Sequence, residues 1–249
     1  MKERSTVMFE VNREYPCTFT APGLDFSTAD QLAIAWAEAM RAKLGGESLL
    51  YRPQKDALEH DHPHLDNYLR RTGVFDASWK VASNGWRGGP VIVAWPDLEH
   101  LGEIGDSSRA TSLCVLPWGE QANPWLSGMA AKPIGDSRIG PLSLPSITDR
   151  AVASAMDDIS QINSVNQSLF GRERDVVVSG FLKLHDSGHS FDPKELYAWA
   201  IAHGWSGRAA FDLKQVTSEI RAGKRLRFKH EPFRADILEI WEKDGEDDE

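Results

Sequence analysis

The stretch that decides the fold is PVIVAWPD, residues 90–97, and it is echoed by SLCVLPWGE, residues 112–120. Each stretch contains a short apolar run that closes with Pro and Trp and is followed by an acidic residue. Continuous apolar runs of this length are typical of strands buried on both faces, as in a parallel sheet covered by helices. Residues 98–104, between them, have a helical pattern. We therefore expect strand, helix and strand, with a ligand crevice beyond the strand ends.

The remainder of the first half continues this pattern. Short strands are expected at residues 8–11, 17–20 and 48–52, and a second helix from His64 to Arg71. A first helix is expected from Asp30 to Leu44, capped by Ser27 or Thr28. Its buried face is predicted from spacing four, as Leu32, Trp36, Met40 and Leu44. Together these elements predict an α/β fold with a mixed or parallel sheet flanked by helices.

After the Pro- and Gly-rich residues 132–145, the sequence pattern changes from alternating strands and helices to helices alone. We place a domain boundary there, with an α/β domain at 1–145 and an all-helical domain at 146–249. The helical domain is expected to begin at a capping box, Ser146–Asp149, with one helix running to Gly171. Residues 172–185 fit a strand or a helix, and their helical neighbours favour the helix. Further helices are expected at 192–204, 207–222 and 233–243.

Composition limits the class of protein. The 249 residues are 41% hydrophobic and 26% charged, as is ordinary for a globular protein, and no apolar run is long enough for a membrane span. The N-terminus lacks a signal-peptide core, and there are only two cysteines, Cys17 and Cys114. We therefore expect a cytoplasmic protein without a disulfide scaffold or a membrane partner.

Charge is unevenly distributed near the C-terminus. The net charge is −9, which argues against bulk binding of nucleic acid. Within residues 221–230, however, there are five cations, one aromatic ring and no acid: Arg221, Lys224, Arg225, Arg227, Phe228 and Lys229. We call residues 221–230 the basic segment. It is the best candidate for binding nucleic acid or an acidic protein. The alternative is that its cations oppose a helix dipole and pair with the acidic tail, residues 236–249.

The strand ends offer a weaker candidate site. If the two strands are parallel neighbours, Asp97 and Glu120 emerge at the same edge of the sheet, where two carboxylates can hold a divalent cation or act as an acid and a base. Trp95 and Trp118 beside them are candidates to line a pocket and stack on a planar ligand. The alternatives are that Asp97 caps the next helix, that Glu120 is solvated and that both rings fill the core.

Three further motifs carry less weight. The segment Glu59–Asp66 is rich in His and Asp but matches no metal motif, so we interpret it as a solvated lead-in to a helix. The sequence HDSGHS, residues 185–190, has hydrolase-like residue types, but a turn that caps the next helix explains it better. The Gly-rich residues 85–89 precede a strand, which is the wrong order for a phosphate loop. No cofactor or metal site follows from the sequence.

Three functional hypotheses remain. The sequence favours a non-enzymatic binding or accessory protein that contacts nucleic acid or an acidic protein through residues 221–230, because no catalytic signature is present. An enzyme is left open, as a metal-dependent nuclease or phosphohydrolase that uses the strand-end carboxylates. The third hypothesis is a structural subunit of a larger complex, with the many Trp residues and the charged C-terminal segments as contact surfaces.

Overall fold

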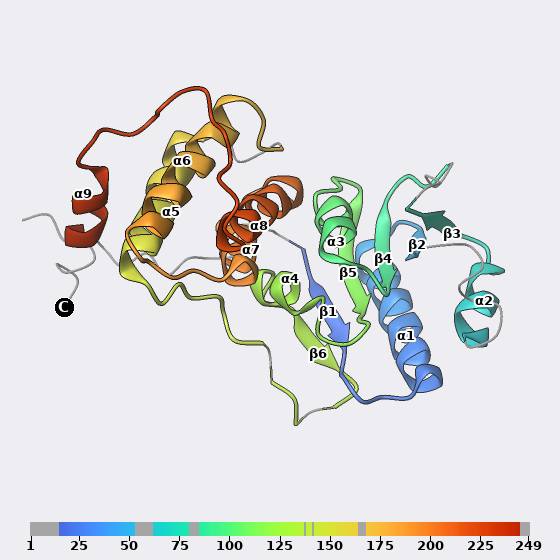
Figure 1. The fold of residues 1–249 in the computed structure, drawn as a ribbon. Coiled ribbons are helices and arrows are strands. Elements are labelled where there is room, and N and C mark those ends of the chain that lie inside the picture. Colours follow the sequence, from blue (N-terminus) through green and yellow to red (C-terminus); the bar gives the residue numbers. More distant parts are fainter. Residues whose placement is uncertain are drawn as a thin grey trace, which may run out of the picture.

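The described chain contains a six-stranded parallel sheet with helices on both faces, followed by a group of further helices (Figure 1). The computed structural model describes residues 15–52, 62–79, 85–136, 138–140, 142–163 and 168–244. The predicted strand at 8–11, the start of the His-rich segment and the last residues of the acidic tail lie outside these ranges. No described helix combines the length and hydropathy that a membrane crossing requires.

The first part of the chain, which we call the α/β part, alternates strands and helices. Its elements are β1 (Cys17–Thr20), α1 (Phe26–Leu44), β2 (Ser48–Arg52), α2 (Pro63–Leu69), β3 (Val74–Ser78), β4 (Gly89–Ala94), α3 (Leu98–Gly105), β5 (Ala110–Leu116), α4 (Asn123–Gly128) and β6 (Lys132–Ile134). The strand order is β3-β2-β4-β5-β1-β6, and all pairings are parallel. The two strands that decided the expected fold, β4 and β5, are neighbours, with Val93 opposite Val115. The predicted α/β class is therefore confirmed.

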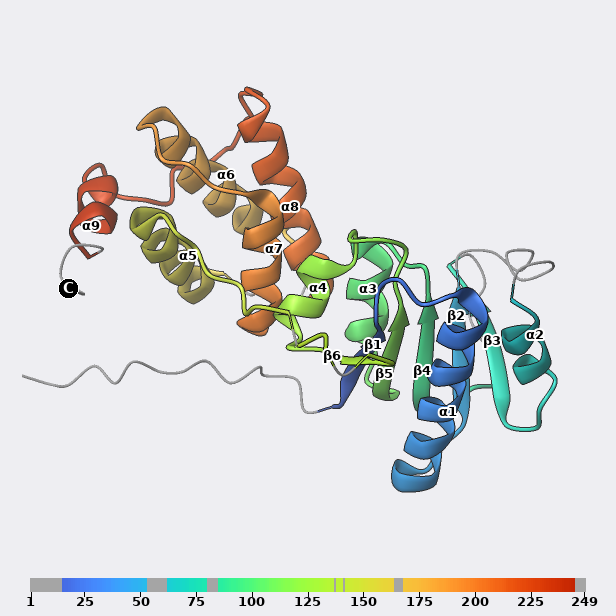
Figure 2. The same ribbon diagram turned by 90° about the horizontal axis from the view of Figure 1, so that it is seen from below.

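Both faces of the sheet are covered, which explains the wholly apolar strands. Side chains of alternate residues point to opposite faces. Ile92 and Cys114 belong to a core with α1 and α2, whereas Val93 and Val115 belong to a second core with α3 and α4. Figure 2 shows α1 on one side of the strands and α3 and α4 on the other.

Helix α1 corrects two sequence predictions. It begins earlier than expected, because the Asp25 carboxylate, rather than Ser27 or Thr28, caps it by accepting the Thr28 amide at 2.9 Å. Its buried face is also different: Ala33 and Ala37 are buried, and the predicted Leu44 is exposed. Small alanines let the helix lie close to β4 and β5, and the larger residues at spacing four flank that contact.

The second part, which we call the helical part, comprises α5 (Arg150–Ile162), α6 (Arg172–Asp186), α7 (Pro193–Ala202), α8 (Gly207–Arg221) and α9 (Ile237–Asp244). The favoured helix at 172–185 is confirmed as α6. Helix α5 is shorter than predicted, because it begins after the capping residue Asp149 and ends at Ile162. Leu169 lies outside it, and its amide donates to Asp212 at 2.9 Å.

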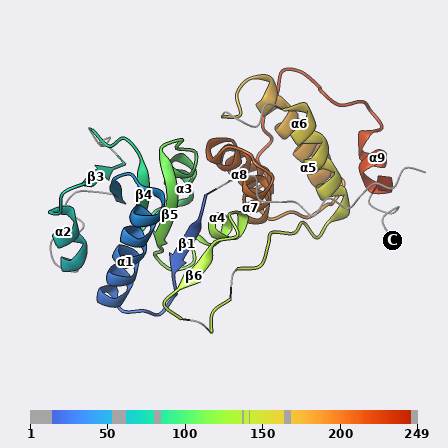
Figure 3. The same cartoon turned by 180° about the vertical axis from the view of Figure 1, so that it is seen from behind.

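The two parts share one hydrophobic core. Helix α7 packs on α4 and α8 packs on α3, and buried residues of both parts form a continuous cluster (Figure 3). At the contact of α3 with α8, Gly102 and Gly207 approach so closely that a Cβ on Gly207 would lie 2.1 Å from the Cα of Gly102. The Tyr197 hydroxyl donates to the Leu98 carbonyl at 2.9 Å. The boundary predicted at 145/146 falls in the irregular connection between β6 and α5 and stays a prediction.

Candidate functional site

The strand-end carboxylates lie at the carboxyl edge of β4 and β5, but they have different surroundings. Asp97 caps α3, where its carboxylate accepts the His100 amide at 2.9 Å and contacts the His100 ring at 2.7 Å. Glu120 is exposed. No interaction links Asp97 with Glu120 within the described residues, and no group of three potential metal ligands occurs in that part of the chain. The cap therefore accounts for Asp97 without a metal.

Trp95 and Trp118 belong to a row of four rings at the same edge. Trp118 is 59% exposed and stacks on Phe26, the first residue of α1, with ring centroids 6.4 Å apart and planes at 18°. Phe26 in turn contacts His62 at 4.9 Å, and His62 contacts Trp95 at 4.2 Å. Trp95 is half-buried. The row therefore runs from the exposed Trp118 through the buried His62 to the half-buried Trp95.

The interpretation of the His-rich segment as a solvated lead-in is wrong for His62. This residue is buried, and its Nδ1 lies 3.1 Å from both carboxylate oxygens of Asp30, which is also buried. Burial raises the pKa of Asp30, and the nearby His62 and His64 only partly offset that effect. His64 remains nearer the surface, where its Nε2 contacts Ser27 Oγ at 2.9 Å and Gln31 Nε2 at 3.0 Å.

The Asp30–His62 pair was missed because its members lie 32 residues apart in sequence. A signal existed in α1 nonetheless. Asp30 shares the face of Ala33 and Ala37 at helical spacing, and an acid on a buried apolar face requires a polar partner. Another acid, imidazole and indole meet on the opposite side of the sheet, where the His100 ring that contacts the partly exposed Asp97 stacks on Trp79 at 3.6 Å.

The basic segment begins in the last turn of α8 and continues without helix or strand. Leu226 and Phe228 are half-buried and pack against the core, whereas Arg225, Arg227 and Lys229 are exposed. Phe228 is thus an anchor of the segment. The buried Asp175 in α6 fixes the far end, because one of its carboxylate oxygens accepts the amides of Lys229 and His230 at 3.1 and 3.3 Å.

Three of the five cations have acidic partners, but these do not come from the acidic tail. Arg221 pairs with Asp192 at 3.1 Å, Arg225 with Asp186 at 2.6 Å and Lys224 with Glu219 at 2.8 Å. Burial alone would raise the pKa of Asp192, but amide hydrogen bonds and Arg221 outweigh it and the pKa is lowered. Arg227 and Lys229 have no acidic partner within the described part of the chain. Arg174 lies beside them, with its guanidinium donating to the Arg227 carbonyl at 3.3 Å.

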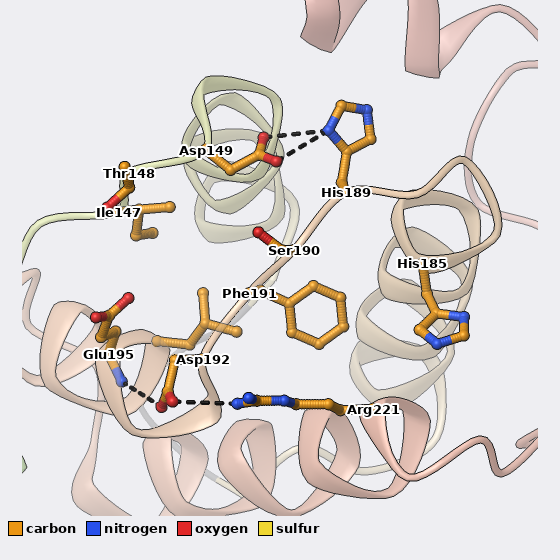
Figure 4. Close-up of a pocket in the computed structure, with 11 residues that line it drawn as sticks. Ile147, Thr148, Asp149, His185, His189, Ser190, Phe191, Asp192, Glu195 and Arg221 are labelled. Atoms are coloured by element: carbon orange, nitrogen blue, oxygen red, sulfur yellow. Dashed lines mark hydrogen bonds and ion pairs between the residues drawn. The ribbon is translucent and has the colours of Figure 1, made fainter.

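A cavity of about 540 Å³ adjoins the start of the basic segment (Figure 4). Figure 4 shows the Asp149–His189 pair on one side, the Asp192–Arg221 pair on the opposite side and Phe191 between them. Three residues of the HDSGHS motif line the cavity, namely His185, His189 and Ser190. Its size lies within the range of small-molecule pockets.

The cavity lacks the arrangement of a nucleophile and its base. Both ring nitrogens of His189 face carboxylates, Asp149 at 3.1 Å and Glu242 at 3.3 Å. Burial alone would lower the pKa of His189, but these two carboxylates outweigh it and the pKa is raised. With both ring nitrogens facing carboxylates, neither is left to accept a proton from Ser190. The geometry therefore agrees with the interpretation of this motif as a structural turn.

Residues 148–242 match the family model described as "Domain of unknown function (DUF1889)". The match spans α5 to α8 and most of α9, and so includes both the cavity and the basic segment. No curated protein and no solved structure matches the chain. The likeness to this family thus concerns the helical part.

Proposed function

We infer that this is a non-enzymatic binding protein whose basic segment contacts the phosphates of a nucleic acid. The observation that supports the proposal is the alternation from Arg225 to Lys229. Inward-facing Leu226 and Phe228 hold the chain, so the cations that alternate with them project to solvent. A row of fixed cations without interleaved acids is suited to a chain of phosphates.

Contacts to phosphates fit the segment better than contacts to bases. Its aromatic ring, Phe228, packs against the core, so it offers less surface for base stacking. Arg227 and Lys229 are exposed and have no acidic partner among the described residues, and Arg174 adds a third cation. Because the whole chain carries a charge of −9, binding is expected to be local and strongly salt-dependent.

The other hypotheses have less support. A metal-dependent nuclease or phosphohydrolase needs free carboxylates, whereas Asp97 already holds the start of α3 and contacts His100. An acidic protein partner would use the same basic segment, and the experiment below separates it from nucleic acid. Membership of a larger complex rests on the many Trp residues and the charged C-terminal segments, and no described contact favours it.

The test is fluorescence anisotropy with labelled single- and double-stranded DNA and RNA at low and moderate salt. Arg227→Ala/Lys229→Ala removes the two cations that lack described acidic partners. We expect weaker binding. The salt dependence should also become weaker: the magnitude of the slope of log K against log salt should decrease by about two, one for each lost phosphate contact. Poly-glutamate is added as a competitor to represent an acidic protein.

The matched control is Lys224→Ala, which removes a cation paired with Glu219. It should change binding less than either single variant at Arg227 or Lys229. If no oligonucleotide binds at low salt, or if the control loses as much affinity as the double variant, the proposal is wrong. Tight binding of poly-glutamate without binding of oligonucleotides would indicate that the segment binds an acidic protein instead of a nucleic acid.

A further inference from the structure

We propose that the ring row at the carboxyl edge of the sheet is a second binding site, which takes a planar heteroaromatic ring of the nucleobase class. The site comprises the rings of Phe26, His62, Trp95 and Trp118 and the polar side chains beside them. It lies in the α/β part, whereas the basic segment leads away to α9 at the far end of the helical part (Figure 2). The proposal does not depend on phosphate binding by that segment.

The topology places this row where a parallel sheet usually binds ligands. Strands β1 and β5 are neighbours, but the helices that follow them, α1 and α4, cover opposite faces. The two connections therefore diverge at the carboxyl edge, and such divergence opens the crevice used by ligands in α/β proteins. Phe26 follows β1 and Trp118 follows β5, so the exposed ring pair stands at this divergence.

The two outer rings provide an accessible stacking surface. Trp118 and Phe26 are 59% and 50% exposed, and their planes differ by only 18°. Leaving large apolar rings in water forgoes about 25 cal/mol for each Å² that remains exposed. A flat ring laid on this pair would recover part of that energy, and near-parallel rings favour a planar ligand over an aliphatic one.

The inner rings are held rigidly, as a binding site requires. The Asp30 carboxylate fixes His62, which contacts both Phe26 and Trp95. Trp95 adopts a φ of 50°, a left-handed conformation that is unfavourable for a bulky residue, and its amide donates to the Leu116 carbonyl at 2.8 Å. Strain of this kind persists only where the surroundings impose it, and it is concentrated at functional sites.

The polar groups beside the rings suit the edge of a heteroaromatic ring. Ser27 and Gln31 project from the first turns of α1 and meet His64 at 2.9 and 3.0 Å. Hydroxyl, amide and imidazole groups both donate and accept hydrogen bonds, as ring nitrogens and exocyclic groups require. None of the described side chains that make up the site is a Lys or Arg. The site should therefore recognise the base, with little contribution from a phosphate.

The test is ligand-observed NMR, by saturation transfer, on the full chain with adenosine, guanosine, cytidine and uridine. Ribose 5-phosphate serves as the ligand that lacks a ring to stack. We expect at least one nucleoside to bind and ribose 5-phosphate not to bind. Trp118→Ala should weaken nucleoside binding roughly 5- to 150-fold, and Trp118→Phe, which keeps a ring, should retain most of it.

Phe170→Ala is the matched control, because Phe170 is an 81% exposed ring in the helical part. It should bind nucleosides as the wild type does, and so should Arg227→Ala/Lys229→Ala. The proposal is overturned if no nucleoside binds at millimolar concentration, if Trp118→Ala binds as the wild type does, or if ribose 5-phosphate binds as well. If the wild type binds nucleosides but no oligonucleotide, only the function proposed for the basic segment is refuted.

Discussion

A buried acid–histidine pair in the α/β part and a surface ion pair in the helical part differ in what they can do. In the α/β part, Asp30 and His62 lie inside the protein, with side chains 1% and 6% exposed. In the helical part, Arg225 and Asp186 meet at the surface, where their side chains are 74% and 42% exposed. A buried pair cannot lose one partner without a large cost, whereas an exposed pair contributes little and can exchange partners. The interior pair is thus a fixed support, and the surface pairs are available to a ligand.

The largest effect is expected when His62 is removed. His62→Ala leaves the Asp30 carboxylate buried without its partner, so we expect the free energy of unfolding to fall by about 3–5 kcal/mol. Urea denaturation measures it. His64→Ala is the control, because its partners Ser27 and Gln31 are exposed, and it should cost less than about 1 kcal/mol. Equal effects of both variants would show that the buried pair is no more important than surface contacts.

The contact between the two parts should be nearly as sensitive, for reasons of packing. Gly207→Ala places a methyl group against the backbone of Gly102 and must separate α8 from α3. We expect a loss of about 1–3 kcal/mol in urea denaturation. Gly140→Ala is the control, because nothing lies within 4 Å of its added Cβ. A neutral Gly207→Ala would mean that the parts can move apart at little cost.

A smaller effect is expected at the buried carboxylate that holds the basic segment. Asp175→Asn weakens acceptance of the Lys229 and His230 amides, and we expect a loss of about 1 kcal/mol in unfolding free energy. The variant keeps the exposed cations of the segment, yet oligonucleotide affinity should fall, because the row of cations is no longer held in place. Unchanged affinity would show that holding the segment in one conformation does not matter for binding.

The local patterns in the sequence predicted the fold well, and contacts distant in sequence were the main source of error. The apolar runs of β4 and β5 and the start of α7, where Asp192 caps and Pro193 follows, act within a few residues. The buried face of α1 was predicted wrongly, because close packing on the sheet selects Ala33 and Ala37 over the larger residues at spacing four. Strand β3, helix α4 and strand β6 are short and were not predicted.

The candidate sites show the same division. The basic segment was visible as a run of charge, but its acidic partners Asp186 and Asp192 come from the end of α6 and the N-cap of α7. Trp95 and Trp118 were identified beside the strand ends, whereas Phe26 and His62 complete the ring row from other elements. Such groupings depend on which helix covers which face, and periodicity alone does not specify that.

The smallest effect concerns His189, which is intermediate between the buried and the exposed pairs. It connects Asp149, the cap of α5, with Glu242 in α9. Its pKa is raised in the folded protein, so its contribution to stability is complete below the unfolded pKa of about 6.5 and is lost as pH rises through the higher folded value. The stability difference between wild type and His189→Gln should therefore decrease from about pH 6 to about pH 8, by less than ~1 kcal/mol.

Urea midpoints across this pH range measure the difference, and Glu242→Gln, which removes one of the two carboxylates, should reproduce part of it. The imidazolium favours α9 against α5 only while it carries its proton, so the difference must decrease toward alkaline pH. A difference that increases with pH would mean that His189 is stabilised in its neutral form. In that case the carboxylates of Asp149 and Glu242 do not dominate the surroundings of His189.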